Sequence, residues 1–128
     1  MAKGQSFLSI PDKTSHGETR HLNVVITVPD DENNVLVVPA CTYHENSHGQ
    51  DESCLLPAGC HPFIIKKSYI SYSHAKEMSL IAIFNGLHNG RLIEKQDFDS
   101  QYIQDMQKGA EISPFLPGKF KRFFEYFL

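Results

Sequence analysis

The stretch that decides the fold is His21-Leu-Asn-Val-Val-Ile-Thr-Val28, which is followed, after the polar turn Asp30–Asn34, by Val35-Leu-Val-Val38. Two runs rich in β-branched residues, separated by a short Asn/Asp-rich segment, predict a β-hairpin. Their nearly continuous apolar character indicates strands that are buried on both faces. We therefore expect antiparallel strands near residues 22–28 and 35–41.

The hydrophobic pattern changes from β to helical further along the chain. Cys54–Leu56 and Ser68–Tyr72 predict shorter strands, and the polar segment Thr42–Ser53 between the strands predicts an exposed loop. After these, apolar residues recur with a helical period and predict helices near residues 79–89, 100–108 and 118–127. Strands followed by helices favour an α+β fold, a small curled antiparallel sheet or barrel followed by two to three helices.

Local signals also mark the ends of the first of these helices. Ser79 is a good N-cap residue, because its hydroxyl can accept a hydrogen bond from the first helical turn. Gly90 is suited to the left-handed conformation that ends many helices.

The 128 residues, of which 41% are hydrophobic and 21% charged, suit one domain spanning residues 1–128. Within it we expect a flexible arm over 1–20, a barrel-like part over 21–75 and a mainly helical part over 76–128. The net charge of −3 argues against binding of duplex DNA by bulk positive charge. Without a long apolar run or a signal-peptide pattern, we expect no membrane contact and a cytoplasmic location.

Six side chains of the kind that bind zinc lie within a short segment: Cys41, His44, His48, Cys54, Cys60 and His61. Strong zinc sites pair two compact two-ligand motifs, and only Cys41-x2-His44 has a suitable spacing. We therefore expect reduced cysteines, no metal and no cofactor. A zinc-stabilised domain built on the three cysteines and one histidine is kept as a third hypothesis.

The segment Gly59-Cys60-His61-Pro62-Phe63 presents a histidine at a corner of the chain. The proline that follows His61 forces it into an extended backbone, which suits a side chain that projects from a turn. An imidazole in such a place can act as a general acid or base. The alternative is a partly buried histidine whose ring hydrogen-bonds the backbone of the corner.

Two further groups of residues have the chemistry to bind phosphate. Thr42 ends the second strand of the hairpin, where its hydroxyl could bind a phosphate oxygen, although threonine is also a good strand residue. Two cations, a hydroxyl and an aromatic ring follow one another at Lys66, Lys67, Ser68 and Tyr69. Such a combination suits single-stranded nucleic acid, and it is also found in ordinary solvated turns.

The segment His21–Thr42 resembles the MazF/PemK-like toxin superfamily, whose members are small SH3-like barrels that cut RNA. The likeness lies in a β-rich strand, a polar turn and a second strand that ends in Pro39-Ala-Cys-Thr42. In that family a threonine at this strand end and an arginine before the first strand lie in the catalytic groove. Thr42 matches the threonine, and the arginine position falls on His21, or on Arg20 with a one-residue shift. The stretch Ser53–Tyr72 looks like a poorly characterised bacterial and phage subgroup with the same barrel-like pattern, so the resemblance covers about residues 20–75.

The resemblance implies the toxin of a toxin–antitoxin pair, an endoribonuclease that cleaves single-stranded RNA without metal. The ribose 2′-OH is the nucleophile in such a reaction, so the protein supplies a base, an acid and donors to the phosphate. We expect His21 and His61 as base and acid, and Thr42 and Ser68 as catalytic donors. The expected RNA-binding residues are Arg20, Lys66, Lys67 and Tyr69. The expected protein partners are a cognate antitoxin and a second copy of the chain.

The alternative hypothesis is a catalytically inactive barrel that binds a protein or a nucleic acid. Two features favour it: the family's Gly-Arg-Pro signature before the first strand is missing, and the net charge of −3 is negative. Cleavage of labelled RNA in excess chelator separates an enzyme from a binding module.

Overall fold

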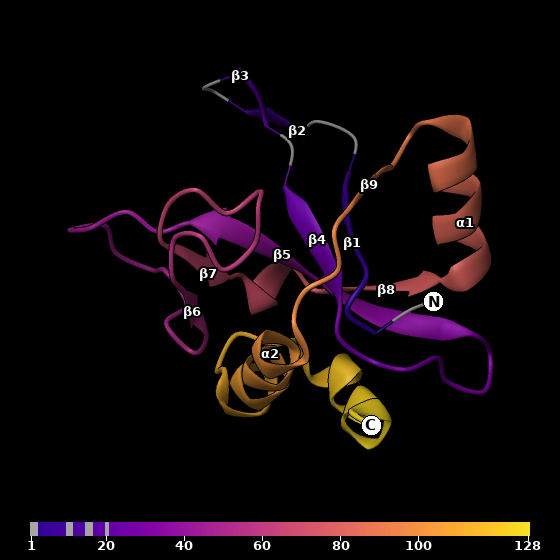
Figure 1. Ribbon diagram of the computed structural model, residues 1–128. Helices are drawn as coiled ribbons and strands as arrows, with labels where there is room; N and C mark the ends of the chain where they lie inside the picture. The colour runs from indigo at the N-terminus through magenta and orange to yellow at the C-terminus, as the bar shows by residue number, and fades with distance from the viewer. Residues whose placement is uncertain (1–2, 10–11, 15–16, 20) are drawn as a thin grey trace.

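The computed structural model describes residues 3–9, 12–14, 17–19 and 21–128, and its fold is α+β, built on a curled antiparallel sheet (Figure 1). The sheet has seven strands in the order β6-β7-β5-β4-β1-β9, with β8 paired to β5, and it is open rather than closed into a barrel. Its strands are β1 (Ser6–Leu8), β4 (Leu22–Val25), β5 (Asn34–Thr42), β6 (Leu55–Leu56), β7 (Ser68–Ile70), β8 (Lys76–Ser79) and β9 (Ile93–Lys95). The α+β prediction is therefore confirmed.

The hairpin of β4 and β5 forms the centre of the sheet, as the sequence predicts. Val24 of β4 lies opposite Val38 of β5 in the antiparallel register. The turn is closed by Asp30, whose Oδ1 accepts hydrogen bonds of 2.9 and 2.8 Å from the N–H groups of Glu32 and Asn34. The strand β4 ends three residues before the predicted end at residue 28.

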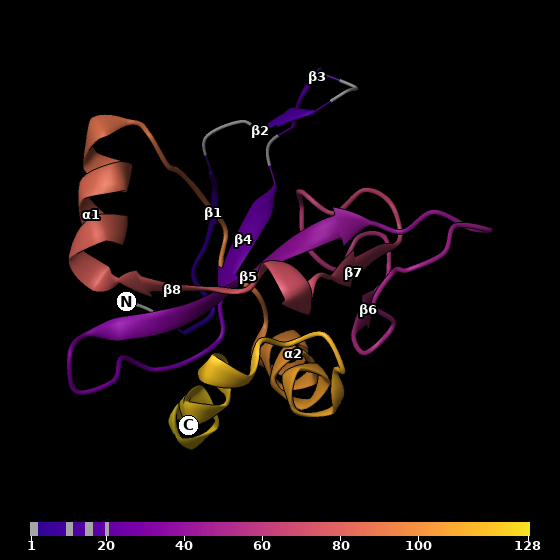
Figure 2. The same cartoon turned by 180° about the vertical axis from the view of Figure 1, so that it is seen from behind.

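Alternating residues of the hairpin pack on two separate hydrophobic clusters. One face of the sheet, with Val24 and Leu36, packs against α2 (Ser100–Ile112) and η2 (Gly118–Tyr126). On the opposite face, α1 (Leu80–Asn89) covers only one end, over Val25 and Val37. Figure 2 shows α1 well apart from α2 and the C-terminus. Among the described residues, no α-helix packs over the remainder of that second face.

The N-terminal segment differs from the expected arm over 1–20. Ser6–Leu8 forms β1 between β4 and β9, and Phe7 is completely buried, so the prediction is wrong for this strand. Asp12–Thr14 (β2) and Gly17–Thr19 (β3) pair with each other as a separate small sheet, which projects from the rest of the fold in Figure 1. Residues 1–2, 10–11, 15–16 and 20 of the expected arm lie outside the described residues.

The first predicted helix is confirmed together with both of its caps. Ser79 Oγ accepts a 3.0 Å hydrogen bond from Ala82 N–H, and Gly90 has the positive φ of 83° expected of a C-cap. The second helix continues past the predicted end at residue 108 to Ile112, so Gly109 lies inside the helix. A Cβ at Gly109 would collide with the hydroxyl of the buried Tyr72.

The C-terminal segment is helical as expected near residues 118–127, and it forms a 3₁₀ helix rather than an α-helix. Phe120 and Phe123, three residues apart, are its buried side chains, and this spacing matches the three-residue turn of a 3₁₀ helix. The part over 76–128 also contributes β8 and β9 to the sheet. Among the described residues, no helix is both long and apolar enough to cross a membrane.

Candidate functional site

The uncovered part of the second sheet face carries two rows of side chains. Strand alternation places these residues together: His21, Asn23, Pro39, Cys41, Tyr69 and Ser71. In the first row, Cys41 lies opposite Tyr69, and its Sγ is 3.8 Å from His21 Nδ1. In the second row, Asn23 lies opposite Pro39, whose carbonyl oxygen accepts a 3.0 Å hydrogen bond from Ser71 N–H.

A pocket of about 400 Å³ lies over these rows, and we call it the histidine pocket. Its lining residues are Ser9, His21, Asn23, Pro39, Cys41, Tyr69, Ser71, His74 and Lys76. His74 comes from η1 (Tyr72–His74), and Lys76 is the first residue of β8. The lining thus includes two imidazoles and one ammonium group. None of the described residues that line the pocket is an aspartate or glutamate.

Each histidine of this pocket is positioned through its Nδ1 atom. His74 Nδ1 is hydrogen-bonded to Ser71 Oγ at 2.8 Å and lies 3.2 Å from Ser73 Oγ, and His21 Nδ1 contacts the Cys41 thiol. Within the described part of the chain, no hydrogen bond involves the Nε2 atom of either ring. Two imidazoles that are held at one nitrogen and open at the other are suited to proton exchange with a ligand.

The Cys41 thiol in the same pocket is a poor nucleophile. Burial raises the pKa of Cys41, and its hydrogen bond with Tyr69 offsets only part of that rise. Burial and the neighbouring Cys41 also raise the pKa of Tyr69. The thiol is therefore protonated near neutral pH, so the pair of Cys41 and His21 does not resemble an activated cysteine nucleophile.

A second pocket, of about 470 Å³, lies at the ends of the central strands, and we call it the apolar pocket. Its lining residues are His21, Leu22, Ala40, Thr42, Pro62, Phe63, Ile64, Ile65, Lys66 and Ser68. Thr42 and Ser68 lie directly opposite each other in the register of β5 and β7. Four of the residues that the sequence singles out, His21, Thr42, Lys66 and Ser68, are thus brought together here.

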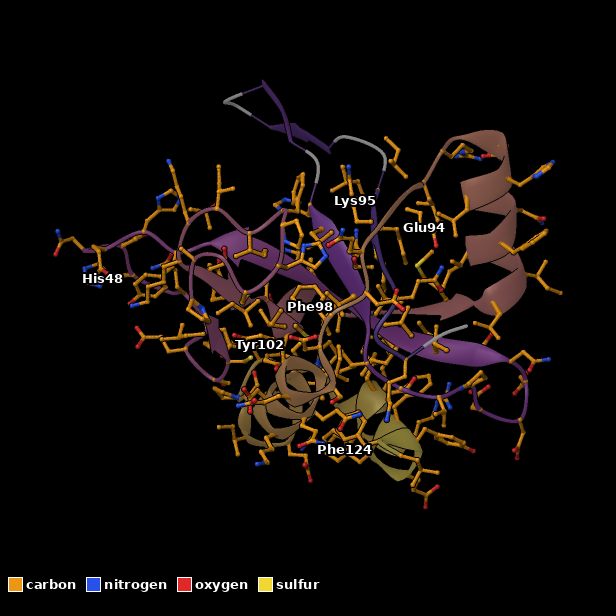
Figure 3. The ribbon with its side chains drawn as sticks, in the orientation of Figure 1. His48, Glu94, Lys95, Phe98, Tyr102 and Phe124 are labelled. Atoms are coloured by element: carbon orange, nitrogen blue, oxygen red, sulfur yellow. The ribbon has the colours of Figure 1, made fainter. Side chains whose placement is uncertain are left out.

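His61 has a different environment from the one expected of a catalytic group. It is only 3% exposed, and its ring stacks on Phe98, which Figure 3 labels beside α2, with centroids 4.5 Å apart. Its Nδ1 accepts a 3.0 Å hydrogen bond from Phe63 N–H, and its Nε2 lies 2.6 Å from the Gln96 carbonyl oxygen and 3.3 Å from Ser6 Oγ. Both nitrogens are therefore engaged, as in the alternative interpretation of this histidine as a structural one.

The other expected RNA-binding residues are divided between several places. Tyr69 lines the histidine pocket, whereas Lys67 lines neither of the two pockets. Lys67 Nζ lies 4.4 Å from the ring centroid of Tyr43 and 3.7 Å from Glu45 Oε1, so its charge is shared with a neighbouring carboxylate. Arg20 lies outside the described residues.

The three cysteines are all free thiols and lie in different surroundings. Cys54 is buried, and burial raises its pKa to about 12. Cys60 is only partly buried, in the turn before His61. In the part of the chain that the structure describes, no three His, Cys, Asp or Glu side chains gather as metal ligands would.

Sequence reasoning missed His74 and Lys76, which complete the histidine pocket. The two-residue alternation of Ser68–Tyr72 could have placed Tyr69 and Ser71 on one face. No local pattern indicated that the turn η1 returns His74 to that face, because this depends on the pairing of β8 with the first half of β5.

Comparison with known proteins gives no relative: no protein-family model, no curated protein and no solved structure matches the chain. The resemblance to MazF/PemK-like toxins stays a prediction.

Proposed function

We propose that the protein is an endoribonuclease that cleaves single-stranded RNA in the histidine pocket by metal-independent acid–base catalysis. The observation that supports this proposal is that His21 and His74 line one pocket together with Lys76. Cleavage of a phosphodiester next to a ribose 2′-OH needs two proton-transfer groups and a positive charge near the phosphate. These three side chains supply them.

The reaction needs no nucleophile from the protein. One imidazole takes the proton of the 2′-OH, whose oxygen forms a bond to phosphorus, and the bond from phosphorus to the 5′-oxygen breaks. The other imidazole gives its proton to the departing 5′-oxygen, so the products are a 2′,3′-cyclic phosphate and a 5′-hydroxyl. Lys76 balances the charge on the phosphate in the transition state. The raised pKa of Cys41 is consistent with a reaction in which no protein nucleophile takes part.

The composition of the lining also favours a polyanionic substrate. The chain as a whole has a net charge of −3, yet the described residues that line the two pockets include His21, His74, Lys66 and Lys76 and no carboxylate. A local region without negative charge in an acidic protein lowers the electrostatic cost of bringing in phosphates. The role of toxin, the cognate antitoxin and the homodimer stay predictions of the resemblance.

The test is cleavage of labelled single-stranded RNA in excess chelator. His21→Ala and His74→Ala should each lower kcat by roughly 10² to 10⁴-fold. His44→Ala and His48→Ala are matched controls, because these histidines are exposed and line neither pocket. A 2′-deoxy substrate should not be cleaved. Cleavage that stops with chelator, or that survives loss of both pocket histidines, contradicts the proposal.

A second candidate function is binding of single-stranded nucleic acid without catalysis. The absence of the Gly-Arg-Pro signature from the sequence favours this alternative. Wild-type protein that binds RNA and leaves it intact in the assay above would select it over the endoribonuclease.

A further inference from the structure

His21 connects the two pockets. It is the residue before β4, and it lines both the histidine pocket and the apolar pocket. A phosphate bound at His21 in the histidine pocket would therefore lie next to the apolar pocket. In a single-stranded RNA, the group attached next to a phosphate is a nucleoside, so the apolar pocket is placed to receive one.

The walls of the apolar pocket are suited to a flat, largely apolar group. Phe63 and Ile65 remain 41% and 78% exposed although both are large and hydrophobic. Phe63 also borders a neighbouring pocket, where Lys95 Nζ lies 5.7 Å from its ring centroid. Lys95 is labelled in Figure 3 and does not line the apolar pocket, whereas Phe63 lines both pockets.

The polar groups of the pocket fit a base and its phosphate better than a hydrocarbon. Ser68 Oγ donates a 2.9 Å hydrogen bond to the Lys66 carbonyl oxygen, so it presents its lone pairs as acceptors. Thr42 lies opposite Ser68 and adds a second hydroxyl. Lys66 is the cation of this pocket, and no carboxylate is found among its described lining residues.

We propose that the apolar pocket is a nucleobase subsite, in which one base of single-stranded RNA stacks on Phe63 beside the phosphate at His21. This inference rests on the proposed function and adds the part of the substrate that the protein recognises. The pocket volume of about 470 Å³ lies in the range of roughly 300–1,000 Å³ that is common for sites of small organic ligands. Stacking of bases on aromatic side chains tolerates many sequences, because every base has a π-face.

The test uses a tryptophan reporter, because the chain contains no tryptophan. Phe63→Trp places the reporter in the subsite, and Phe84→Trp places it on the exposed face of α1 as a matched control. Both proteins are titrated with 2′-O-methyl hexaadenylate and hexauridylate, which cannot be cleaved, and with an abasic hexamer of the same charge. For the Phe63→Trp protein we expect saturable quenching by at least one of the base-containing oligomers and no quenching by the abasic one. The Phe84→Trp protein should show no quenching with any of them.

Binding affinity gives a second readout that does not depend on the reporter. Phe63→Ala should weaken binding of the same 2′-O-methyl oligomers by about tenfold or more, whereas Phe84→Ala should not change it. Ile65→Ser tests the same wall at a residue that is more exposed than Phe63. Quenching that is absent with every oligomer, or equal in the two tryptophan variants, overturns the subsite.

The two proposals fail in different ways. If RNA cleavage depends on His21 and His74 but no base stacks on the side chain at position 63, the endoribonuclease proposal stands and the subsite proposal is wrong. If a base stacks at that position but ordinary RNA is not cleaved, the subsite belongs to a binding protein and the endoribonuclease proposal is wrong.

Discussion

His61 Nε2 lies 2.6 Å from the carbonyl oxygen of Gln96, the residue after β9, and this contact ties the corner at Pro62 to the edge of the sheet. Because Phe63 N–H donates to Nδ1, the ring proton is on Nε2 and is donated to Gln96. The ring therefore acts as a bridge between two backbone groups. This arrangement explains how the His61 ring can be buried although Pro62 and Phe63, which follow it, are exposed.

The first prediction separates this structural role from a catalytic one. His61→Ala removes a 3% exposed ring and leaves Phe63 N–H without its acceptor, while the Gln96 carbonyl keeps only its hydrogen bond from Ser6 Oγ. It should lower the free energy of unfolding by about 3 kcal/mol, as measured by urea denaturation. The kcat for RNA cleavage, measured at a temperature at which the variant is folded, should stay within a few-fold of wild type. A loss of kcat as large as that of His21→Ala would show that His61 takes part in catalysis.

The elements that the sequence predicts well are those with local signals. The hairpin has β-branched runs and an Asx-type turn at Asp30, and α1 has Ser79 and Gly90 at its ends, so each can be recognised without knowing the rest of the fold. The strand Ser6–Leu8 has no such signal. It is three residues long and depends on pairing with β4 and β9, which are distant in sequence.

The candidate site was only partly predictable for the same reason. Thr42 and Ser68 could be placed at strand ends, but their position opposite each other follows from the register of β5 and β7. His74 and Lys76 join His21 only because β8 pairs with the first half of β5. Register and non-local pairing are determined by the packing of the whole sheet, and no short motif encodes them.

The second prediction concerns acid stability. Burial alone would raise the pKa of Asp30, but hydrogen bonds from the N–H groups of Asn34 and Glu32 and from Arg122 outweigh it and hold that pKa below its usual 3.8. A carboxylate whose pKa is lower in the folded than in the unfolded state stabilises the fold at pH values above its unfolded pKa. This contribution is lost as the pH falls below about 4 and the folded carboxylate becomes protonated.

Asp30→Asn should therefore lower the free energy of unfolding at pH 7, and the difference from wild type should shrink steadily from about pH 5 to pH 2. Denaturation series across this pH range measure it. The neighbouring Asp31→Asn is the control, because Asp31 is exposed and should show little effect. A difference for Asp30→Asn that does not change with pH would mean that the charge of Asp30 contributes nothing.

The third prediction concerns the close contact between α2 and η1. Gly109→Ala places a methyl group against the hydroxyl of Tyr72, which is fixed by a 2.6 Å hydrogen bond to the Met106 carbonyl oxygen, and 2.8 Å from Cys54 Cβ. Overpacking of this kind should lower the free energy of unfolding by about 2 kcal/mol, measured by urea denaturation. Gly118→Ala is the matched control, because nothing lies within 4 Å of its Cβ, and it should change stability by less than about 0.5 kcal/mol.

The last prediction tests whether Cys41 takes part in the chemistry. It lies 3.8 Å from His21 in the histidine pocket, an arrangement that would suit a thiolate nucleophile if the thiol ionised near neutral pH. Burial raises the pKa of Cys41, so almost none of it is thiolate at pH 7. Cys41→Ala should therefore keep kcat for RNA cleavage within a few-fold of wild type, and iodoacetamide should alkylate Cys41 more slowly than a free thiol. Because a thiolate nucleophile would leave a covalent adduct, mass spectrometry of the protein during turnover gives an independent check. A loss of kcat in Cys41→Ala comparable to that in His21→Ala, together with such an adduct, would mean that the Cys41 thiolate attacks the phosphate in place of the ribose 2′-OH.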